Sequence, residues 1–145
     1  MTLVVIVVVW LVGLSITSRK QPELEMVNGQ LQPCPATPNC VCSEFPSKNF
    51  HVGPLGYSGT SDEAWSRLKR VISDTGGKVI AEKSDYLRAV YQTPLLRFVD
   101  DVEFRLNTDQ AVIHVRSASR VGHSDLGANR QRVEKIRARF GELTD

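Results

Sequence analysis

Three cysteines stand close together in the run Cys-Pro-Ala-Thr-Pro-Asn-Cys-Val-Cys, which extends from Cys34 to Cys42. A bridge between Cys34 and Cys40 would close a small loop that two prolines already stiffen, and it would restrict the unfolded chain. Zinc sites usually show closely paired cysteines or added histidine ligands, and only His51 lies near in the sequence. The spacing favours a disulfide, leaves free thiols as the alternative, and supports a metal site least, so we assign no metal ligand.

A second group of candidate residues alternates with apolar positions along the segments 97–106 and 111–120, together with Arg88 of the preceding expected strand. Their polar face is either a solvated surface with cross-strand ion pairs, each worth roughly a few tenths of a kcal/mol, or a small pocket. In the pocket interpretation, carboxylates orient cationic side chains toward an anionic or polar ligand. The residues of this face are Arg88, Asp101, Glu103, Arg105, His114, Arg116 and Arg120.

Asp100 fits neither interpretation, because the two-residue alternation places its side chain on the apolar face of the same segment. An ionised carboxylate in apolar surroundings is costly unless it is paired. We therefore expect Asp100 near the end of a sheet, where it reaches Ser117 or the loop after the last strand.

A third group lies where the last predicted strand leads into the last predicted helix. The strand ends at Arg120, the chain turns at a glycine, and the first helical turn contains Asn129 and Arg130. Free amides at a helix N-terminus suit anions, and the two arginines could add charge-assisted hydrogen bonds. In the alternative interpretation, Ser124 and Asp125 cap the helix and Asn129 ties the loop to the strand.

Nucleophilic catalysis and metal-dependent hydrolysis have little support. The adjacent residues His123, Ser124 and Asp125 cannot all point at one another as a catalytic triad does. The remaining His, Asp and Glu residues match no metal-hydrolase motif. No cofactor is expected from the sequence.

The charge balance argues against nucleic acid as a partner. The chain of 145 residues carries 18 Lys and Arg against 16 Asp and Glu, and the excess disappears once Arg19 and Lys20 are set aside. A neutral domain lacks the basic excess that binding to a phosphate backbone needs. We expect no nucleic-acid partner.

The elements that must position these residues follow an apolar N-terminal segment. Thr2 to Thr17 carries no charge, and we interpret residues 2–18 as a transmembrane helix or uncleaved signal anchor, with a cleaved signal and a buried strand as alternatives. Arg19 and Lys20 favour a cytoplasmic domain by the positive-inside tendency, whereas a disulfide favours an oxidising compartment. We predict a single-pass membrane protein whose domain lies on the periplasmic side.

The remaining chain divides into three parts. Residues 19–32 are polar without an apolar period and are predicted to be a tether. Residues 33–60 are rich in Pro and Cys and are predicted to be irregular, and residues 61–141 show the regular patterns of one α+β domain. Its expected elements are a helix capped by Ser61 or Asp62 and ended by Gly76-Gly77, strands at 78–82, 86–93, 97–106 and 111–120, and a last helix with Leu126, Val133, Ile136 and Phe140 on one face.

The element order αββββα predicts a two-layer sandwich. A four-stranded antiparallel β-meander would carry both helices on one face. A hairpin turn at 107–110 would place Glu103 opposite His114 and Asp101 opposite Arg116.

Four motifs carry a family resemblance: Cys34-Pro-x-Thr-Pro-Asn-Cys40-Val, Tyr86-Leu87, Phe98-Val-Asp-Asp-Val-Glu103, and Arg116-Ser-Ala-Ser-Arg120-x-Gly122-x-Ser124-Asp125-x-Gly127-x-Asn129-Arg130. Together they resemble the domain of unknown function 1499 family over residues 33–140. The resemblance implies a small protein of bacteria or plastids, often with an N-terminal export or membrane segment, and it brings no established activity. Cys42 stands where the family usually has Ser, which supports the Cys34–Cys40 pair, and His123 stands where an aromatic residue is common.

These observations predict a membrane-anchored, non-enzymatic domain that binds a small polar or anionic ligand, or an envelope protein. The first alternative is a hydrolase-like enzyme with Asp100 or Asp101 as base and Arg116 and Arg120 holding an anionic group. The second alternative is a purely structural membrane-proximal module. The candidate ligand-binding residues are Asp100, Asp101, Glu103, Arg116, Ser119, Arg120, Ser124, Asp125, Asn129 and Arg130.

Overall fold

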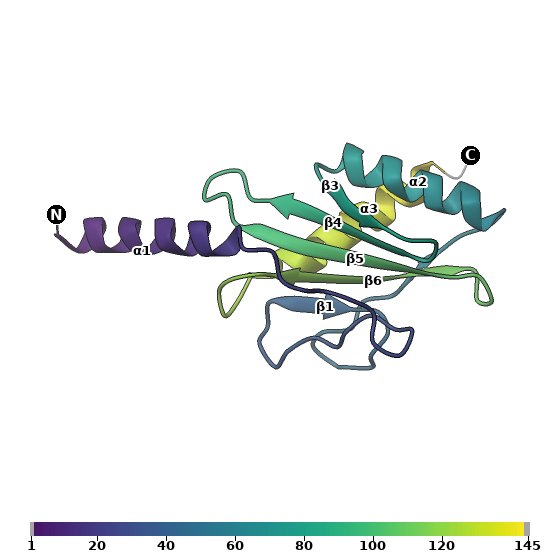
Figure 1. The fold of residues 1–145 in the computed structure, drawn as a ribbon, viewed down its shortest axis with the longest axis horizontal. Helices are drawn as coiled ribbons and strands as arrows, with labels where there is room; N and C mark the ends of the chain where they lie inside the picture. Colours follow the sequence, from purple (N-terminus) through teal and green to yellow (C-terminus); the bar gives the residue numbers. More distant parts are fainter. Residues whose placement is uncertain (1, 144–145) are drawn as a thin grey trace.

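Six strands form one antiparallel sheet in the computed structural model, which describes residues 2–143, and two helices pack on one face of the sheet (Figure 1). The strands lie in the order β1-β6-β5-β4-β3, and β2 also pairs with β6. We call the face that carries the helices the inner face and the opposite one the outer face. The elements are α1 (Thr2–Ser18), β1 (Cys40–Cys42), β2 (Leu55–Gly56), α2 (Ser61–Asp74), β3 (Lys78–Glu82), β4 (Tyr86–Gln92), β5 (Val99–Asn107), β6 (Val112–Ser119) and α3 (Ala128–Glu142).

The α+β class agrees with the sequence prediction, but the predicted four-stranded sheet is wrong. The two additional strands, β1 and β2, come from the segment that was expected to be irregular, and both pair with β6. They are only three and two residues long, too short to show an alternating pattern. Their pairing satisfies backbone groups of β6 that would otherwise lie at the edge of the sheet.

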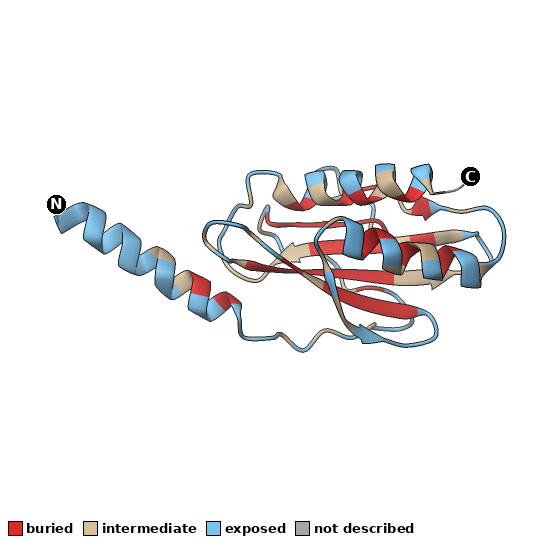
Figure 2. Ribbon diagram, turned by 90° about the horizontal axis from the view of Figure 1, so that it is seen from above, coloured by how far each residue is buried: buried red, intermediate tan, exposed pale blue. Residues whose placement is uncertain are grey.

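The prediction of a transmembrane helix over residues 2–18 is also wrong. Within residues 2–143, none of the helices has the length and apolar character needed to cross a membrane. The helix α1 has 17 residues, which extend about 26 Å and fall short of a hydrocarbon core of about 30 Å. Figure 2 shows α1 exposed along most of its length, with its buried residues, Ser15 and Ser18, near its C-terminal end.

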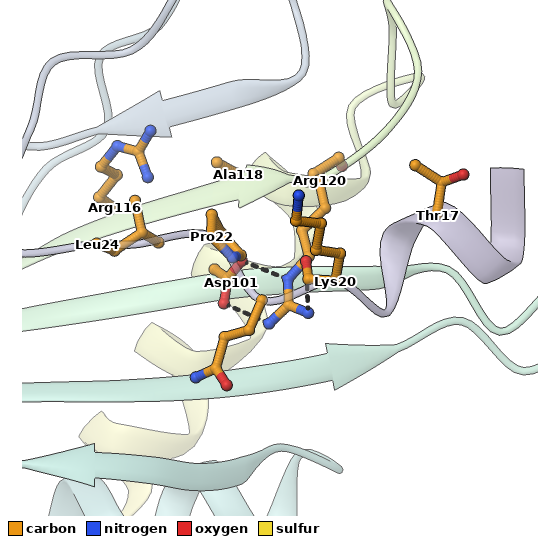
Figure 3. A pocket seen from close by; sticks show the side chains of 10 residues that line it. Thr17, Lys20, Pro22, Leu24, Asp101, Arg116, Ala118 and Arg120 are labelled. Atoms are coloured by element: carbon orange, nitrogen blue, oxygen red, sulfur yellow. Dashed lines mark hydrogen bonds and ion pairs between the residues drawn. The ribbon is translucent and has the colours of Figure 1, made fainter.

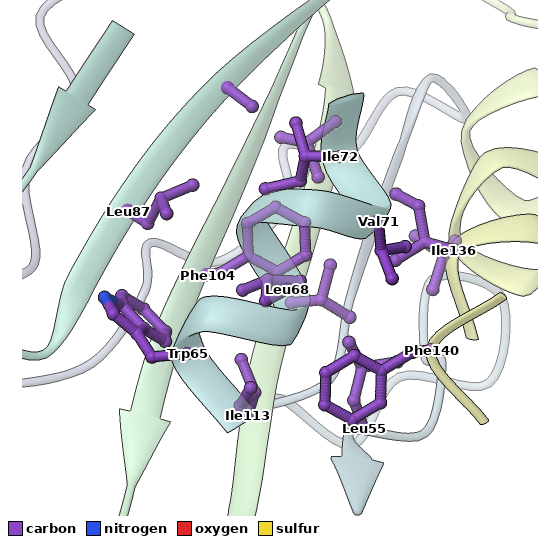
Figure 4. Packing of buried hydrophobic residues seen from close by; sticks show 14 of the residues in the cluster. Leu55, Trp65, Leu68, Val71, Ile72, Leu87, Phe104, Ile113, Ile136 and Phe140 are labelled. Atoms are coloured by element: carbon purple, nitrogen blue, oxygen red, sulfur yellow. The ribbon is translucent and has the colours of Figure 1, made fainter. Parts of the chain in front are cut away.

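The core lies between the inner face and the two helices (Figure 4). The helix α2 buries the predicted apolar residues at 3.6-residue spacing, from Ala64 to Ile72. Its N-cap is Thr60 rather than Ser61 or Asp62, and a capping box joins Thr60 to Glu63. The reciprocal side-chain hydrogen bonds of that box satisfy amide donors that a helix start leaves free.

The last helix, α3, begins later than predicted. Gly127 is its N-cap, while the Asp125 carboxylate accepts hydrogen bonds from the Gly127 and Asn129 amides. Val133 is fully buried as expected. Leu126 was predicted on the same buried face, but it lies before the helix with a positive φ of 53°, and its side chain is 91% exposed.

The β5–β6 hairpin differs from the prediction by two residues in register. Asn107 pairs with Val112, and Ala111 ends the loop with a φ of 50°. Because the turn is centred one residue later than expected, Glu103 pairs with Arg116, and Asp101 pairs with Ala118. A shift of two residues keeps every side chain on its predicted face and changes only its neighbours.

The outer face is covered by the chain between α1 and β2. The segment 19–32, predicted to be a tether, crosses this face as the thin dark purple and blue coil that follows α1 in Figure 1. Leu31 is 1% exposed, and it forms a small second apolar cluster with Cys42 and Tyr86. The polar residues of the outer face therefore lie beneath a layer of chain.

Candidate functional site

Asp101 is the centre of a buried charge network on the outer face. It is 2% exposed. Its Oδ1 accepts hydrogen bonds from Nε and Nη2 of Arg88, at 2.9 and 2.7 Å, and from Nη2 of Arg120 at 2.9 Å. Its Oδ2 accepts from Nε of Arg120 at 2.7 Å. Two guanidinium groups thus compensate the cost of burying one carboxylate.

The same two arginines hold the segment after α1 through its backbone. Nη1 of Arg120 donates to the carbonyl oxygens of Ser18, Arg19 and Lys20, at 3.1, 3.3 and 3.4 Å. Nη1 of Arg88 donates to the carbonyl oxygen of Pro22 at 3.0 Å. The last carbonyls of a helix have no partner within the helix, and a cation there is favourable. The segment is therefore fastened to the sheet.

Glu103 forms the second buried network of the outer face and is fully buried. Its Oε1 accepts from the Tyr86 hydroxyl and its Oε2 from Nη1 of Arg116, both at 2.8 Å. Burial and the Glu103 charge raise the pKa of Tyr86 well above its usual range, so the phenol stays a donor. Arg116 is 7% exposed, and its Nε has no hydrogen-bond partner among the described residues.

A pocket of about 430 Å³ lies between this network and the segment after α1. In Figure 3, Arg116 and Leu24 lie at one end of the pocket and Thr17 at the other, with Asp101 and Arg120 between them. Three cationic side chains and one carboxylate line it. The lining residues are Thr17, Lys20, Gln21, Pro22, Leu24, Asp101, Arg116, Ala118, Ser119 and Arg120.

Asp100 belongs to a different network on the inner face, because successive residues of a strand point to opposite faces. Its Oδ2 accepts a hydrogen bond of 2.5 Å from Nη2 of Arg132. Burial raises the pKa of the Asp100 carboxyl, while Arg132 and Ser119 act against that shift. Asp100 and Asp101 therefore point to opposite faces of the sheet and belong to different networks.

Asn129 joins the inner network to the loops around it. Its Oδ1 accepts from the Ser117 hydroxyl at 2.6 Å. Its Nδ2 donates to the Asn39 carbonyl and the Ser119 hydroxyl, both at 2.9 Å, and to Asp125 at 2.7 Å. These bonds tie α3 to β6 and to the disulfide loop. The interpretation of Asn129 as a tie between loop and strand describes this geometry better than a ligand site.

The predicted ligand residues therefore form two groups and a remainder. Asp101, Glu103, Arg116 and Arg120 gather on the outer face, and Asp100, Ser119, Asp125 and Asn129 on the inner side. The exposed remainder, Ser124 and Arg130, joins neither group. The Ser124 hydroxyl accepts from the Leu126 amide, and Arg130 donates to the carbonyls of Asn49 and His51.

The sequence reasoning missed several partners of these residues. Arg132, Asn39 and Ser43 were not singled out, although Arg132 stands one helical turn after Asn129, a spacing that could have indicated a shared face. Ser43 accepts from the Val115 amide at 2.9 Å and contacts Nδ1 of His114 at 3.1 Å. Burial lowers the pKa of His114, which favours the neutral form of the ring.

The predicted disulfide between Cys34 and Cys40 is confirmed. Cys42 is free and buried. Burial raises the pKa of its thiol, and the neighbouring Arg116 guanidinium acts against that shift. Among residues 2–143, no three His, Cys, Asp or Glu side chains group in a way that could hold a metal ion.

The family model described as "Protein of unknown function (DUF1499)" matches residues 30–140, in agreement with the resemblance seen in the motifs. The curated proteins contain no match to the chain. The matched range includes the side chains of all three charge networks, the disulfide and all of the sheet. The helix α1 and the segment that roofs the outer pocket precede it.

Proposed function

The chain belongs to the DUF1499 family of proteins of unknown function, and we propose that its outer-face pocket binds a small anion such as a phosphate or carboxylate group. Arg116, Arg120 and Lys20 would supply the positive charge. Asp101 and Glu103 would hold the arginines in place and take no part in chemistry, since their oxygens already accept hydrogen bonds from cations and from Tyr86.

The unpaired Nε of Arg116 is the observation that carries the proposal. A buried donor without a partner costs about 1–3 kcal/mol. The unpaired donor belongs to Arg116, a residue that is 7% exposed and lines the pocket. A guanidinium presents its donors in a planar fork that matches carboxylate and phosphate oxygens. An anion that entered beside Arg116 and reached this donor would remove the cost.

The charge of the pocket supports the same ligand class. Asp101 is shared between Arg88 and Arg120, and Glu103 pairs with Arg116. Three guanidinium groups thus face two carboxylates, and Lys20 adds an exposed ammonium at the pocket wall. The positive excess is local, because the domain as a whole is neutral.

The proposal is tested by titrating the full chain with inorganic phosphate in an isothermal calorimeter. Lys20→Met removes a pocket cation that is exposed, and we expect it to weaken phosphate binding about fivefold, the effect of losing roughly 1 kcal/mol of partly screened attraction. Lys78→Met is the matched control, because Lys78 is exposed on β3, an edge strand that β4 and β5 separate from β6. Equal weakening by both variants would refute the site.

Arg116 needs a paired substitution, because Arg116→Met alone would leave the buried Glu103 without its cation and would destabilise the fold. In the double variant Arg116→Met/Glu103→Gln, the amide oxygen can still accept a hydrogen bond from the Tyr86 hydroxyl. We expect this variant to be folded, with a cooperative thermal unfolding transition, and to lose phosphate binding. Phosphate affinity equal to that of the natural chain would show that Arg116 is not part of the site.

A further inference from the structure

A second pocket lies beside the first, between α1 and the loops at the end of the sheet. It has a volume of about 340 Å³. Three apolar side chains of α1, Trp10, Leu11 and Leu14, form one wall. The opposite walls come from the chain between β4 and β5 and from the loop after β6, with Phe98, Val121 and Leu126 as their apolar residues.

The carboxylates and the Ser119 hydroxyl of this second pocket already have partners, whereas His123, which also lines it, is exposed to solvent. Asp100 is 3% exposed and pairs with Arg132. The Asp125 carboxylate accepts hydrogen bonds from the start of α3, and the Ser119 hydroxyl accepts from Asn129. These groups therefore need no hydrogen bonds from a ligand. The free surface of the pocket therefore suits an apolar group.

The two pockets share walls. Ser119 lines both of them. Trp10 and Leu14 line the second pocket and Thr17 the first. These three residues are spaced by four and three positions and so follow one stripe of the helix. The stripe extends about 10 Å along the axis at roughly 1.5 Å per residue, from the apolar pocket to the cationic one.

We propose that the two pockets together bind one single-chain anionic amphiphile. Its charged group would lie against Arg116 and Lys20, and its alkyl chain would follow the α1 stripe past Leu14 to Trp10. The inference rests on the proposed anion site and adds the class of molecule that carries the anion. It commits to a soluble, monomeric amphiphile, because both pockets are bounded by protein on the sheet side and on the α1 side.

The fluorescence of Trp10 reports on this site directly. Trp10 is 62% exposed, whereas the chain's other tryptophan, Trp65, is 8% exposed. Decyl phosphate, added to the full chain below its micelle-forming concentration, is expected to shift the Trp10 emission to shorter wavelength and to bind at least about 100-fold more tightly than inorganic phosphate. The Trp10→Phe variant should lose the spectral shift.

Two substitutions on α1 separate the tail pocket from the anion site. Leu14→Gln is expected to weaken decyl phosphate binding about tenfold and to leave the affinity for inorganic phosphate unchanged. Val12→Gln is the matched control, because Val12 is 52% exposed on α1 and does not line the pocket. Decanol, which lacks the anion, should bind much more weakly than decyl phosphate.

The possible failures are distinguishable. If decyl phosphate binds no more tightly than inorganic phosphate, or if Leu14→Gln and Val12→Gln behave alike, the amphiphile inference is overturned while the anion site stands. Binding only to vesicles that contain an anionic lipid, with no binding of the monomer, would also overturn it. If neither phosphate nor decyl phosphate binds, the proposed function itself fails.

Discussion

The substitution Asp101→Asn is expected to destabilise this protein more than the loss of an ordinary surface charge. Asp101 is 2% exposed, and the two arginines that bind it have side chains only 6% and 7% exposed. An asparagine would keep the size of the side chain and remove the charge. Arg88 and Arg120 would then remain buried without an anionic partner.

The size of the effect follows from this burial. Removing one partner of a buried ion pair costs about 3–5 kcal/mol, because the other charge stays uncompensated. For a chain of this length, each kcal/mol lowers the melting temperature by about 2–4 °C. We therefore expect Asp101→Asn to lower the melting temperature by about 6–20 °C in a thermal unfolding experiment followed by circular dichroism.

The substitution should also loosen the segment after α1, since the arginines held by Asp101 bind its carbonyls. Trypsin cleavage after Arg19 or Lys20 gives an independent measure, and we expect Asp101→Asn to accelerate it well below the melting temperature. Asp109→Asn is the matched control, because Asp109 is exposed in the β5–β6 turn. If the free energies of unfolding of the two variants differ by less than about 1 kcal/mol, the buried network contributes little to stability and our reasoning is wrong.

Three further predictions concern the cysteines and His114. Removing the Cys34–Cys40 bridge by Cys34→Ser/Cys40→Ser is expected to cost about 2 kcal/mol in urea unfolding, the chain-entropy value for a loop this short. In the natural chain in intact cells, labelling of Cys34 and Cys40 by an impermeant maleimide only after reduction would support the predicted extracytoplasmic location. Labelling that needs a broken membrane and then proceeds without reductant would contradict it. Burial lowers the pKa of His114, Arg105 adds to this shift, and Glu44 opposes it, so the folded chain takes up this proton at a lower pH than the unfolded chain. The contribution of the neutral His114 to stability is complete above about pH 6.5 and is lost as the pH falls from there through the folded-state pKa. We therefore expect His114→Asn to lose less stability than the natural chain between about pH 7.5 and about pH 5. An equal loss in both proteins would contradict the lowered pKa of His114.

Local sequence patterns were sufficient for the elements whose side chains alternate between water and the core. The 3.6-residue spacing from Ala64 to Ile72 predicted α2, and the two-residue alternation of β5 and β6 predicted which residues face outward. These periods are set by backbone geometry within one element, so a short stretch of sequence contains them. The Cys34–Cys40 bridge was also predictable, because its spacing is local.

The partners of those side chains depended on features with a weaker sequence signal. The register that pairs Glu103 with Arg116 depends on a turn in which Ala111 takes a positive φ, a conformation that its residue type rarely adopts. The edge strands β1 and β2 are too short to show a pattern and form only because β6 offers them free backbone groups. For β1 and β2 the deciding contact comes from elsewhere in the chain.

The roof over the outer face shows the difference most clearly. The residue types and alternation of the strands already indicated a cluster of Asp, Glu and Arg on one face, and the sequence left open whether that face was solvated or formed a pocket. The tertiary structure decided this by laying residues 19–32 across it. Arg88 and Arg120 hold that segment through the carbonyls of Ser18 and Pro22 and their neighbours. Backbone carbonyls are common to every residue, so the sequence of the segment carries no sign of where it binds.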